Sequence, residues 1–254
     1  MTKGGHDMRK ITGIPYGEHK ENLLDLYLPD EGAFDLFLYA HGGGMEAGNR
    51  AKEAVVYEHL AQHGIAVASI DYRMYPEAKY PDFVEDTAAA AAWVHAHIGG
   101  YGDCRRIFIG GSSAGAYLSM MLCFDERWLG AHGLSAADFA GFVHDAGQPT
   151  KHFNVLRELG IDTRRVIVDD TAPLYHIGKT IDLPPMLFIV SDNDMENRIE
   201  QTTLVRSTLR HFGFPEEKMP LRLMHGKHCH YLRQMDEHGS VLGGIIEEFI
   251  RACP

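Results

Sequence analysis

A serine in the middle of the chain has the sequence surroundings that a nucleophile requires. Ser113 is the centre of Gly-Ser-Ser-Ala-Gly at 111–115, which follows an apolar run at 106–109 and precedes small and helix-forming residues. This order predicts a strand, a sharp turn and a helix, the arrangement called a nucleophile elbow. The turn places the serine at the end of a strand, and the two glycines leave room where a Cβ would collide with backbone. We expect Ser113, rather than its neighbour Ser112, to be the nucleophile.

A glycine triplet lies upstream, directly after another apolar run. Residues 34–40 read Phe-Asp-Leu-Phe-Leu-Tyr-Ala and lead into His41 and three glycines. Glycines after a buried strand let backbone N–H groups point inward, as the stabilisation of an oxyanion requires. We therefore predict an oxyanion hole made by the backbone N–H groups of Gly43, Gly44 and Ala114.

Acids and histidines follow the serine in the order in which an orienting acid and a base would follow it. Asp192 and Asp194 come after an apolar run at 184–191. Three histidines, His225, His228 and His230, come after the run at 221–224. By position alone, both aspartates and all three histidines qualify as partners of the serine.

The segments between these motifs predict alternating strands and helices. Strands are expected at 11–14, 22–28, 34–40, 65–71, 106–109, 139–145, 184–191 and 221–224. Helices are expected at 51–63, at 82–98, after 114, up to about 212 and at about 237–251. A strand, a helix and a strand in succession imply a right-handed parallel crossover. The sequence therefore predicts an α/β fold with a mostly parallel central sheet, helices on both faces and an antiparallel lead-in.

Length and charge narrow the classes of protein to which the chain can belong. Its 254 residues suit one large domain, 1–254, and 45% hydrophobic with 23% charged residues indicate a globular protein. The 24 Lys and Arg face 35 Asp and Glu, which gives a formal charge of -11 without a basic run. This balance argues against nucleic acid or a membrane as partner and favours a neutral or cationic substrate.

Cysteines and histidines do not indicate a metal or a disulfide framework. The four cysteines are scattered without a Cys-x-x-Cys pair. The loop at 225–231 holds three histidines and Cys229, but no paired set of ligands lies elsewhere at finger-like spacing. We expect no metal and no cofactor. Because the first seven residues lack an apolar segment and no later run approaches membrane-spanning length, we expect a cytoplasmic location, with a processed secreted form left open.

Three motifs together resemble one family. They are His41-Gly-Gly-Gly44, Asp71-Tyr-Arg73 followed by Pro76-Glu77 and Tyr80-Pro81, and Gly111-x-Ser113-Ala-Gly115. In this order and spacing, dense from about 34 to 120, they resemble the carboxylesterase branch of the α/β-hydrolase superfamily, and within it the hormone-sensitive-lipase-like and small feruloyl-esterase-like members. The resemblance implies the α/β-hydrolase fold. Family members often carry Asp before the serine, where this chain has Ser112, and an aromatic residue where it has Met45.

The resemblance also chooses among the partners of the serine. In related hydrolases the acid usually stands three residues past the position of Ser191, which favours Asp194 over Asp192. The turn Gly226-Lys227-His228 resembles the turn of the family, which favours His228 over His230 and His225. The predicted catalytic triad is Ser113, Asp194 and His228.

Hydrolysis of a carboxylic ester through an acyl-enzyme is the resulting hypothesis, with a short or small aromatic acyl group. A formamidase or small-amide hydrolase would use the same residues, and a non-catalytic small-molecule-binding protein would share the fold. The expected partner is a small-molecule ester, not nucleic acid or a membrane, and a homodimer is left open.

Two further segments receive structural predictions. Residues 147–180 are mixed and polar, and we expect them to form a small cap or lid inserted over the active site. Asp71 and Arg73 carry charges after a predicted strand, and we expect them to form a structural ion pair rather than to take part in catalysis.

Overall fold

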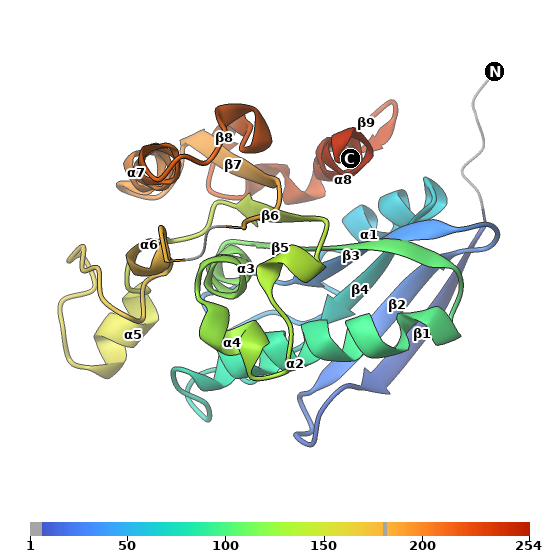
Figure 1. Ribbon diagram of the computed structural model, residues 1–254, viewed down its shortest axis with the longest axis horizontal. Coiled ribbons are helices and arrows are strands. Elements are labelled where there is room, and N and C mark those ends of the chain that lie inside the picture. The colour runs from blue at the N-terminus through green and yellow to red at the C-terminus, as the bar shows by residue number, and fades with distance from the viewer. Residues whose placement is uncertain (1–6, 180–181) are drawn as a thin grey trace.

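One sheet of eight strands organises the described part of the chain, residues 7–179 and 182–254, in a computed structural model (Figure 1). The strand order is β1-β2-β4-β3-β5-β6-β7-β8. β1 pairs antiparallel with β2, and β2 with β4, whereas the other neighbours are parallel. The predicted α/β class, with its antiparallel lead-in, is confirmed. The strands are β1 (Met8–Pro15), β2 (Leu23–Pro29), β3 (Phe34–Ala40), β4 (Ile65–Ile70), β5 (Cys104–Ser112), β6 (Gly141–Asp145), β7 (Met186–Asn193) and β8 (Leu221–Lys227).

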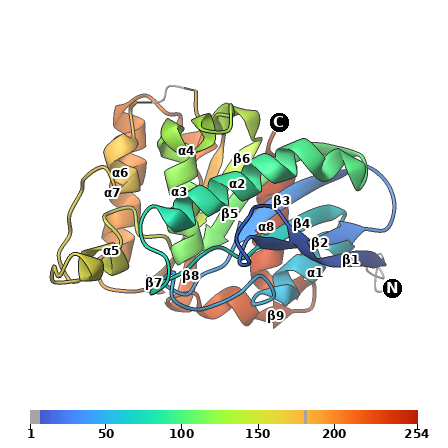
Figure 2. The same cartoon turned by 90° about the horizontal axis from the view of Figure 1, so that it is seen from below.

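Helices cover both faces of this sheet. α1 and α8 share one core with one side of the sheet, while α2, α3 and α7 share the other, as Figures 1 and 2 show. The α-helices are α1 (Ala54–Gln62), α2 (Asp82–His97), α3 (Ala114–Phe124), α4 (Glu126–Gly130), α5 (Phe153–Glu158), α6 (Pro173–His176), α7 (Arg198–His211) and α8 (Val241–Ala252). Short 3₁₀ helices are η1 (Ile98–Gly100), η2 (Ala136–Asp138), η3 (Glu216–Lys218) and η4 (His230–Arg233).

The central strand β3 shows why the sequence folds in this way. All seven of its residues are buried. Leu36 and Leu38 belong to the core beneath α2 and α3, and Phe37 and Tyr39 to the core beneath α1 and α8. Side chains alternate between the faces of a strand, so a strand covered on both faces is mostly apolar, and its one charge, on Asp35, is paired with Arg106. The apolar run at 34–40 is that strand.

Two predicted boundaries near the C-terminus are wrong. β8 continues to Lys227 instead of ending at 224, because it stays paired with β7 as far as Asn193. The last helix begins at Val241 instead of about 237, because β9 (Met235–Asp236) and β10 (Gly239–Ser240) form a small hairpin before it. The Ser240 hydroxyl accepts a hydrogen bond from the Gly243 N–H at 3.1 Å and so caps the start of α8.

The segment between β6 and β7 carries α5 and α6 and includes the predicted cap at 147–180, of which residue 180 lies outside the described residues. Helix α5 lies against the loop that follows β3. The Asn154 amide donates to the Gly44 carbonyl, and Arg157 pairs with Glu46. The role of this segment as a cap stays a prediction.

Cysteines and helix lengths bear on the predicted surroundings of the protein. All four cysteines are free; Cys123 and Cys253 are buried and the other two half-buried. None of the helices in the described ranges is both long and apolar enough to cross a membrane. The cytoplasmic location stays a prediction.

Candidate active site

Ser113 lies at the turn between β5 and α3, as predicted for a nucleophile elbow. Its φ is 55° and its ψ is -112°, a conformation that is costly for a residue with a Cβ. The Ser113 N–H donates to the Asp145 carbonyl at 2.7 Å and so holds the turn. A Cβ on Gly111 or Gly115 would collide with the Ala40 carbonyl of β3. Both glycines are therefore required by the close approach of β3 to the turn.

Two hydrogen bonds connect the serine to a histidine and the histidine to an aspartate. His228 Nε2 lies 2.9 Å from Ser113 Oγ, and His228 Nδ1 lies 2.6 Å from Asp194 Oδ1. Because the carboxylate can only accept at neutral pH, Nδ1 carries the proton and donates it to Asp194. Nε2 is then free to accept the proton of the serine hydroxyl.

The surroundings of Asp194 keep its side chain ionised although it is buried. Burial alone raises the pKa of a carboxyl group. Here the hydrogen bond and charge of His228, together with the backbone N–H groups of Met195 and Ser191, outweigh burial and hold the pKa of Asp194 below its ordinary value. The distances to these N–H groups are 2.7 and 3.2 Å. An ionised acid at this place would stabilise a proton received by His228.

The alternative partners lie outside this arrangement. His225 Nδ1 is 2.7 Å from Asp192 Oδ2, and the Gly226 N–H donates to Asp192 Oδ1 at 2.9 Å. His230 is exposed and begins η4. The structure thus brings Ser113, Asp194 and His228 together and pairs Asp192 with His225.

The loop after β3 offers backbone N–H groups beside the serine. A Cβ on Gly42 would lie 3.1 Å from the Cβ of Ser113, so the loop and the serine are in contact. Gly43 and Gly44 have φ values of 129° and 67°. Within residues 7–179 and 182–254, neither N–H group donates to a protein acceptor. Ala114 begins α3, and the first N–H groups of a helix have no partner within it.

Side chains hold the carbonyl groups of the same loop. The Tyr72 hydroxyl donates to the His41 carbonyl at 2.7 Å, and Lys52 Nζ donates to the Gly42 carbonyl at 3.0 Å. The ring of His41 stacks on that of Tyr72 at 4.5 Å, and burial lowers the pKa of His41 to about 4. His41 is therefore a neutral, buried support of the loop.

The chain is similar to several known esterases. The family model BD-FAE matches residues 24–129, which include the glycine triplet and Ser113. The probable isoprenylcysteine alpha-carbonyl methylesterase ICMEL1 of Oryza sativa subsp. japonica is 38% identical over 109 residues, 42% of this chain and 26% of that protein. The chain thus spans about a quarter of the length of the first curated relatives that it matches. An acetyl esterase of Salmonella schwarzengrund is 25% identical over 240 residues, 87% of this chain and 72% of that protein.

A solved structure covers nearly the whole chain. Esterase B of Lactobacillus rhamnosis superposes with a TM-score of 0.75 over 97% of this chain and 85% of that chain, at 18% identity. The chain therefore has the fold of this esterase, an α/β-hydrolase fold. At this level of identity the structural likeness shows the fold alone, and activity and substrate are argued from the site.

Two further side chains lie next to the site although sequence analysis did not assign them a role. Cys229 Sγ is 3.6 Å from His228 Nε2, and burial raises the pKa of the thiol well above its ordinary value, so it is not a thiolate. Asp145, at the end of β6, is buried behind Ser112 and accepts hydrogen bonds from Ser112 and Tyr231. The sequence did indicate both positions. Cys229 directly follows the predicted base, and Asp145 ends a predicted strand.

One cluster of side chains has the residue types of a metal site. His59, His63 and Glu247 bring their ligand atoms within 4.8 Å of one another. However, the Ser240 N–H donates to His59 Nδ1 at 3.2 Å, which leaves the proton on Nε2, the nitrogen that faces Glu247 at 3.4 Å. The two imidazole rings are stacked at 4.2 Å rather than turned toward a common point. The cluster links α1 to α8 and does not offer two free imidazole nitrogens to one ion.

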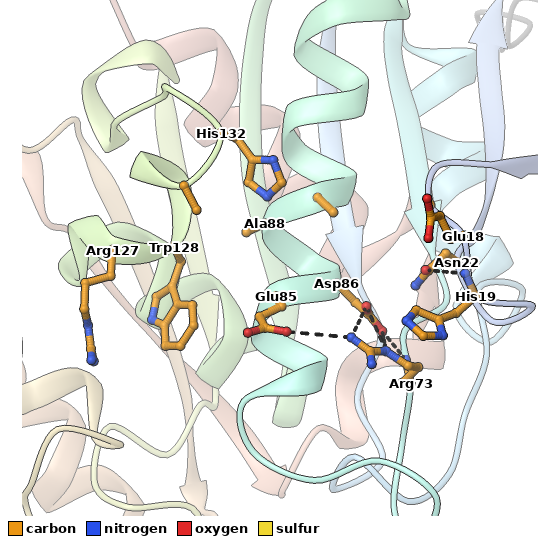
Figure 3. Close-up of a pocket in the computed structure, with 13 residues that line it drawn as sticks. Glu18, His19, Asn22, Arg73, Glu85, Asp86, Ala88, Arg127, Trp128 and His132 are labelled. Atoms are coloured by element: carbon orange, nitrogen blue, oxygen red, sulfur yellow. Dashed lines mark hydrogen bonds and ion pairs between the residues drawn. The ribbon is translucent and has the colours of Figure 1, made fainter.

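A groove of about 510 Å³ lies between α2, α4 and the turn after β1 (Figure 3). Arg73 lines the groove and forms an ion pair with Asp86 at 2.8 Å. Asp71 forms its ion pair with Arg50 instead. The prediction that Asp71 and Arg73 are structural charges stands, but the prediction that they pair with each other is wrong. The described residues that line the groove include none of the predicted catalytic residues.

Proposed function

We propose that the chain is a serine hydrolase that cleaves a carboxylic ester through an acyl-enzyme. The observation that carries the proposal is the continuous line of hydrogen bonds from Asp194 through His228 to Ser113, 2.6 and 2.9 Å long. A serine hydroxyl is a weak nucleophile until a base takes its proton. The esterases among the sequence relatives support the same conclusion.

In the first half of the reaction, His228 Nε2 takes the proton of Ser113 as Oγ attacks the ester carbonyl carbon. The carbonyl oxygen gains the electron pair and becomes an oxyanion. When the tetrahedral intermediate collapses, the bond to the alcohol oxygen breaks, and the imidazolium returns the proton to that oxygen. An alcohol leaves, and the acyl group stays on Ser113. The ionised Asp194 stabilises the imidazolium between these steps.

In the second half, water takes the place of the alcohol. His228 takes a proton from the water as its oxygen attacks the acyl carbon. Collapse of the second tetrahedral intermediate breaks the bond to Ser113 Oγ, which recovers its proton from His228. A carboxylic acid leaves, and the enzyme is restored.

Backbone N–H groups of Gly43, Gly44 and Ala114 are proposed to bind the oxyanion. Their support is the contact of the loop with Ser113 and the absence of other acceptors for Gly43 and Gly44 in the described chain. One such donor contributes about 3 kcal/mol to transition-state stabilisation. The bonds from Tyr72 and Lys52 to the loop carbonyls hold the loop in place before the substrate arrives.

A short or small aromatic acyl group is the proposed substrate feature. The ring of Phe153 on α5 comes within 3.3 Å of the place that a Cβ on Gly44 would occupy, so α5 limits the space above the loop. The similarity to an acetyl esterase agrees with a small acyl group. The formal charge of -11 favours a neutral or cationic ester.

Labelling with a fluorophosphonate, followed by peptide mapping, tests the mechanism. We expect the label on Ser113, and we expect Ser113→Ala to lose both the label and the hydrolysis of p-nitrophenyl esters. Ser207→Ala, which alters a half-buried serine of α7 whose hydroxyl donates to the Leu204 carbonyl, is the matched control and should behave as the wild type. An unlabelled wild type, or activity that survives Ser113→Ala, contradicts the proposal.

A substrate series then tests the acyl group. p-Nitrophenyl esters of increasing chain length, hydroxycinnamate esters, acetylated sugars and an aryl formamide are compared by kcat/KM. We expect the short or small aromatic esters to be fastest. A preference for long acyl chains contradicts the proposed pocket, and a preference for the formamide shows an amide hydrolase with the same triad.

A further inference from the structure

A buried carboxylate lies directly behind the nucleophile. Asp145 is the last residue of β6 and is opposite Ser112 in the register of β5 and β6. Its side chain is buried, and its backbone carbonyl accepts the Ser113 N–H at 2.7 Å. The proposed mechanism assigns no step to this carboxylate, although a buried charge is costly unless hydrogen bonds compensate for it.

Both oxygens of the carboxylate accept hydrogen bonds from buried hydroxyl groups. Ser112 Oγ donates to Oδ2, and the Tyr231 hydroxyl donates to Oδ1. The Tyr39 hydroxyl lies 2.7 Å from Ser112 Oγ. Because the one proton of Ser112 goes to Asp145, Tyr39 must donate to Ser112. The result is a chain of donors, each of them buried, that ends on one acceptor.

The two direct donors belong to the two loops that must meet for catalysis. Ser112 immediately precedes Ser113 in the elbow. Tyr231 lies in η4, three residues after His228. The Asp145 carboxylate therefore connects the loop of the nucleophile to the loop of the base, although the two loops are far apart along the chain.

We propose that Asp145 is a positioning residue, which holds Ser113 and His228 at hydrogen-bonding distance through Ser112 and Tyr231. The inference rests on the proposed function, because it assigns a purpose to the distance between the proposed nucleophile and its base. A misplacement of reacting groups by about 1 Å can cost on the order of 10²-fold in rate. The gain in rate from a fixed link between the two loops thus offsets the unfavourable free energy of burying the carboxylate.

The electrostatic surroundings of Asp145 are consistent with a role as the shared acceptor. Burial raises the pKa of Asp145 to about 6, although the hydrogen bonds from Ser112 and Tyr231 act in the opposite direction. The charges that act on it come from His228, which lowers its pKa, and Asp194, which raises it. Burial raises the pKa of Glu53 at the start of α1, and the charge of Asp145 adds a smaller rise. At neutral pH the group is ionised and can accept from both donors.

Two variants each remove one donor and leave the carboxylate in place. Tyr231→Phe deletes the hydroxyl from η4, and Ser112→Ala deletes the one from the elbow. We expect either change to lower kcat by about 10- to 100-fold while KM changes less than about twofold, because the reacting groups are misplaced but the substrate still binds. The rate at which a fluorophosphonate labels Ser113 should fall by the same factor.

Tyr16→Phe is the matched control. The Tyr16 hydroxyl is also mostly buried and donates to a backbone carbonyl, that of Asp71, at 2.5 Å, away from the elbow and from η4. We expect this variant to lose stability in urea much as Tyr231→Phe does, and to keep the kcat and the labelling rate of the wild type. The contrast separates loss of a buried hydroxyl from loss of position.

Asp145→Asn tests whether the two donors act through the carboxylate. In that background, a further Tyr231→Phe or Ser112→Ala change should lower kcat by much less than it does in the wild type, because the shared acceptor is already altered. Additive losses would contradict the shared link.

The outcomes for Asp145 and for the proposed function are distinguishable. If Tyr231→Phe and Ser112→Ala fold and keep the kcat and labelling rate of the wild type, Asp145 is a structural residue and the positioning role is wrong, while the hydrolase stands. If the wild type itself is neither labelled nor active on any ester, the proposed function fails, and the positioning role fails with it.

Discussion

Two His–Asp pairs stand next to each other at the ends of β7 and β8. In one, His228 Nδ1 is 2.6 Å from Asp194; in the other, His225 Nδ1 is 2.7 Å from Asp192. The Asp194 and His228 side chains are 0% and 23% exposed, whereas the Asp192 and His225 side chains are 40% and 94% exposed. The two hydrogen bonds have nearly the same length, but the two pairs differ in exposure to solvent.

The difference teaches that residue types and bond length do not identify a catalytic pair. The inner pair, Asp194 and His228, has a third partner, because the second nitrogen of His228 faces Ser113. The outer pair, Asp192 and His225, lies in water, where an ion pair contributes little and salt screens it. A half-buried, oriented imidazole with a hydroxyl at its far nitrogen can transfer a proton, whereas the exposed imidazole of His225 has only Asp192 as a side-chain partner.

Removal of each histidine should give the largest contrast. We expect His228→Ala to lower kcat by about 10⁶-fold, because Ser113 loses its base. We expect His225→Ala to change kcat by less than about twofold, as for an exposed side chain without a partner in the reaction. Hydrolysis of p-nitrophenyl acetate measures both. A large loss in His225→Ala would reverse the assignment of inner and outer pairs.

Replacement of each aspartate should give a smaller contrast. Asp194→Asn keeps the shape of the side chain but favours the wrong tautomer of His228, so kcat should fall by about 10⁴-fold. Asp192→Asn should leave kcat within about twofold of the wild type. The two variants are compared at one pH in the same ester assay. Equal losses would show that the two acids share the task.

Titration in low and high salt should reveal the smallest contrast. The hydrogen bond from His225 and the Gly226 N–H hold the pKa of Asp192 below its ordinary value, and the group is exposed. Salt at about 1 M shortens the screening length to about 3 Å, so the pKa of Asp192 should rise toward its ordinary value. The pKa of Asp194, whose side chain is buried, should stay low. Carbon-detected NMR follows both carboxyl groups, and an equal response to salt would contradict the difference in burial.

The turn that carries Ser113 could be predicted from the sequence because its requirements are local. The elbow needs two glycines at fixed offsets from Ser113, and the contact of Gly111 and Gly115 with the Ala40 carbonyl shows why. The same holds for the strands, whose apolar runs report burial directly. The fold class followed from the order of those runs.

The partners of the serine could not be chosen from local pattern. Asp192 still belongs to β7 and His225 to β8, since both strands are longer than their apolar runs. The pairing of the two strands brings both acids and two histidines to the same edge of the sheet. Which nitrogen faces Ser113 depends on the turn at 226–229, where Gly226 and Cys229 have φ values of 109° and 53°. Resemblance to a family, not spacing, favoured Asp194 and His228.

Asp145 was missed because its partners are distant in sequence. It lies 33 residues from Ser112 and 86 from Tyr231. A signal was nevertheless present, since the elbow carries Ser112 where related elbows often carry an acid. The register of the sheet places Asp145 opposite Ser112, so an acid on the neighbouring strand lies next to that position.

The buried acids also bear on how the protein should be handled. Burial raises the pKa of Asp145 from 3.8 to about 6 and that of Glu53 from 4.5 to about 7. Between the ordinary and the raised values, the folded protein keeps protons that the unfolded chain has released, so these two groups make the free energy of unfolding decrease as the pH rises through that window. Below it, their contribution no longer changes with pH.

The buried histidines act in the opposite direction, since burial lowers the pKa of His41 to about 4 and the pKa values of His144 and His152 to about 3. As the pH falls below about 6.5, the unfolded chain binds protons that these three folded-state imidazoles do not bind, so their contribution to the free energy of unfolding decreases. Three histidines oppose two acids, so a near-neutral storage buffer should preserve the fold better than an acidic one.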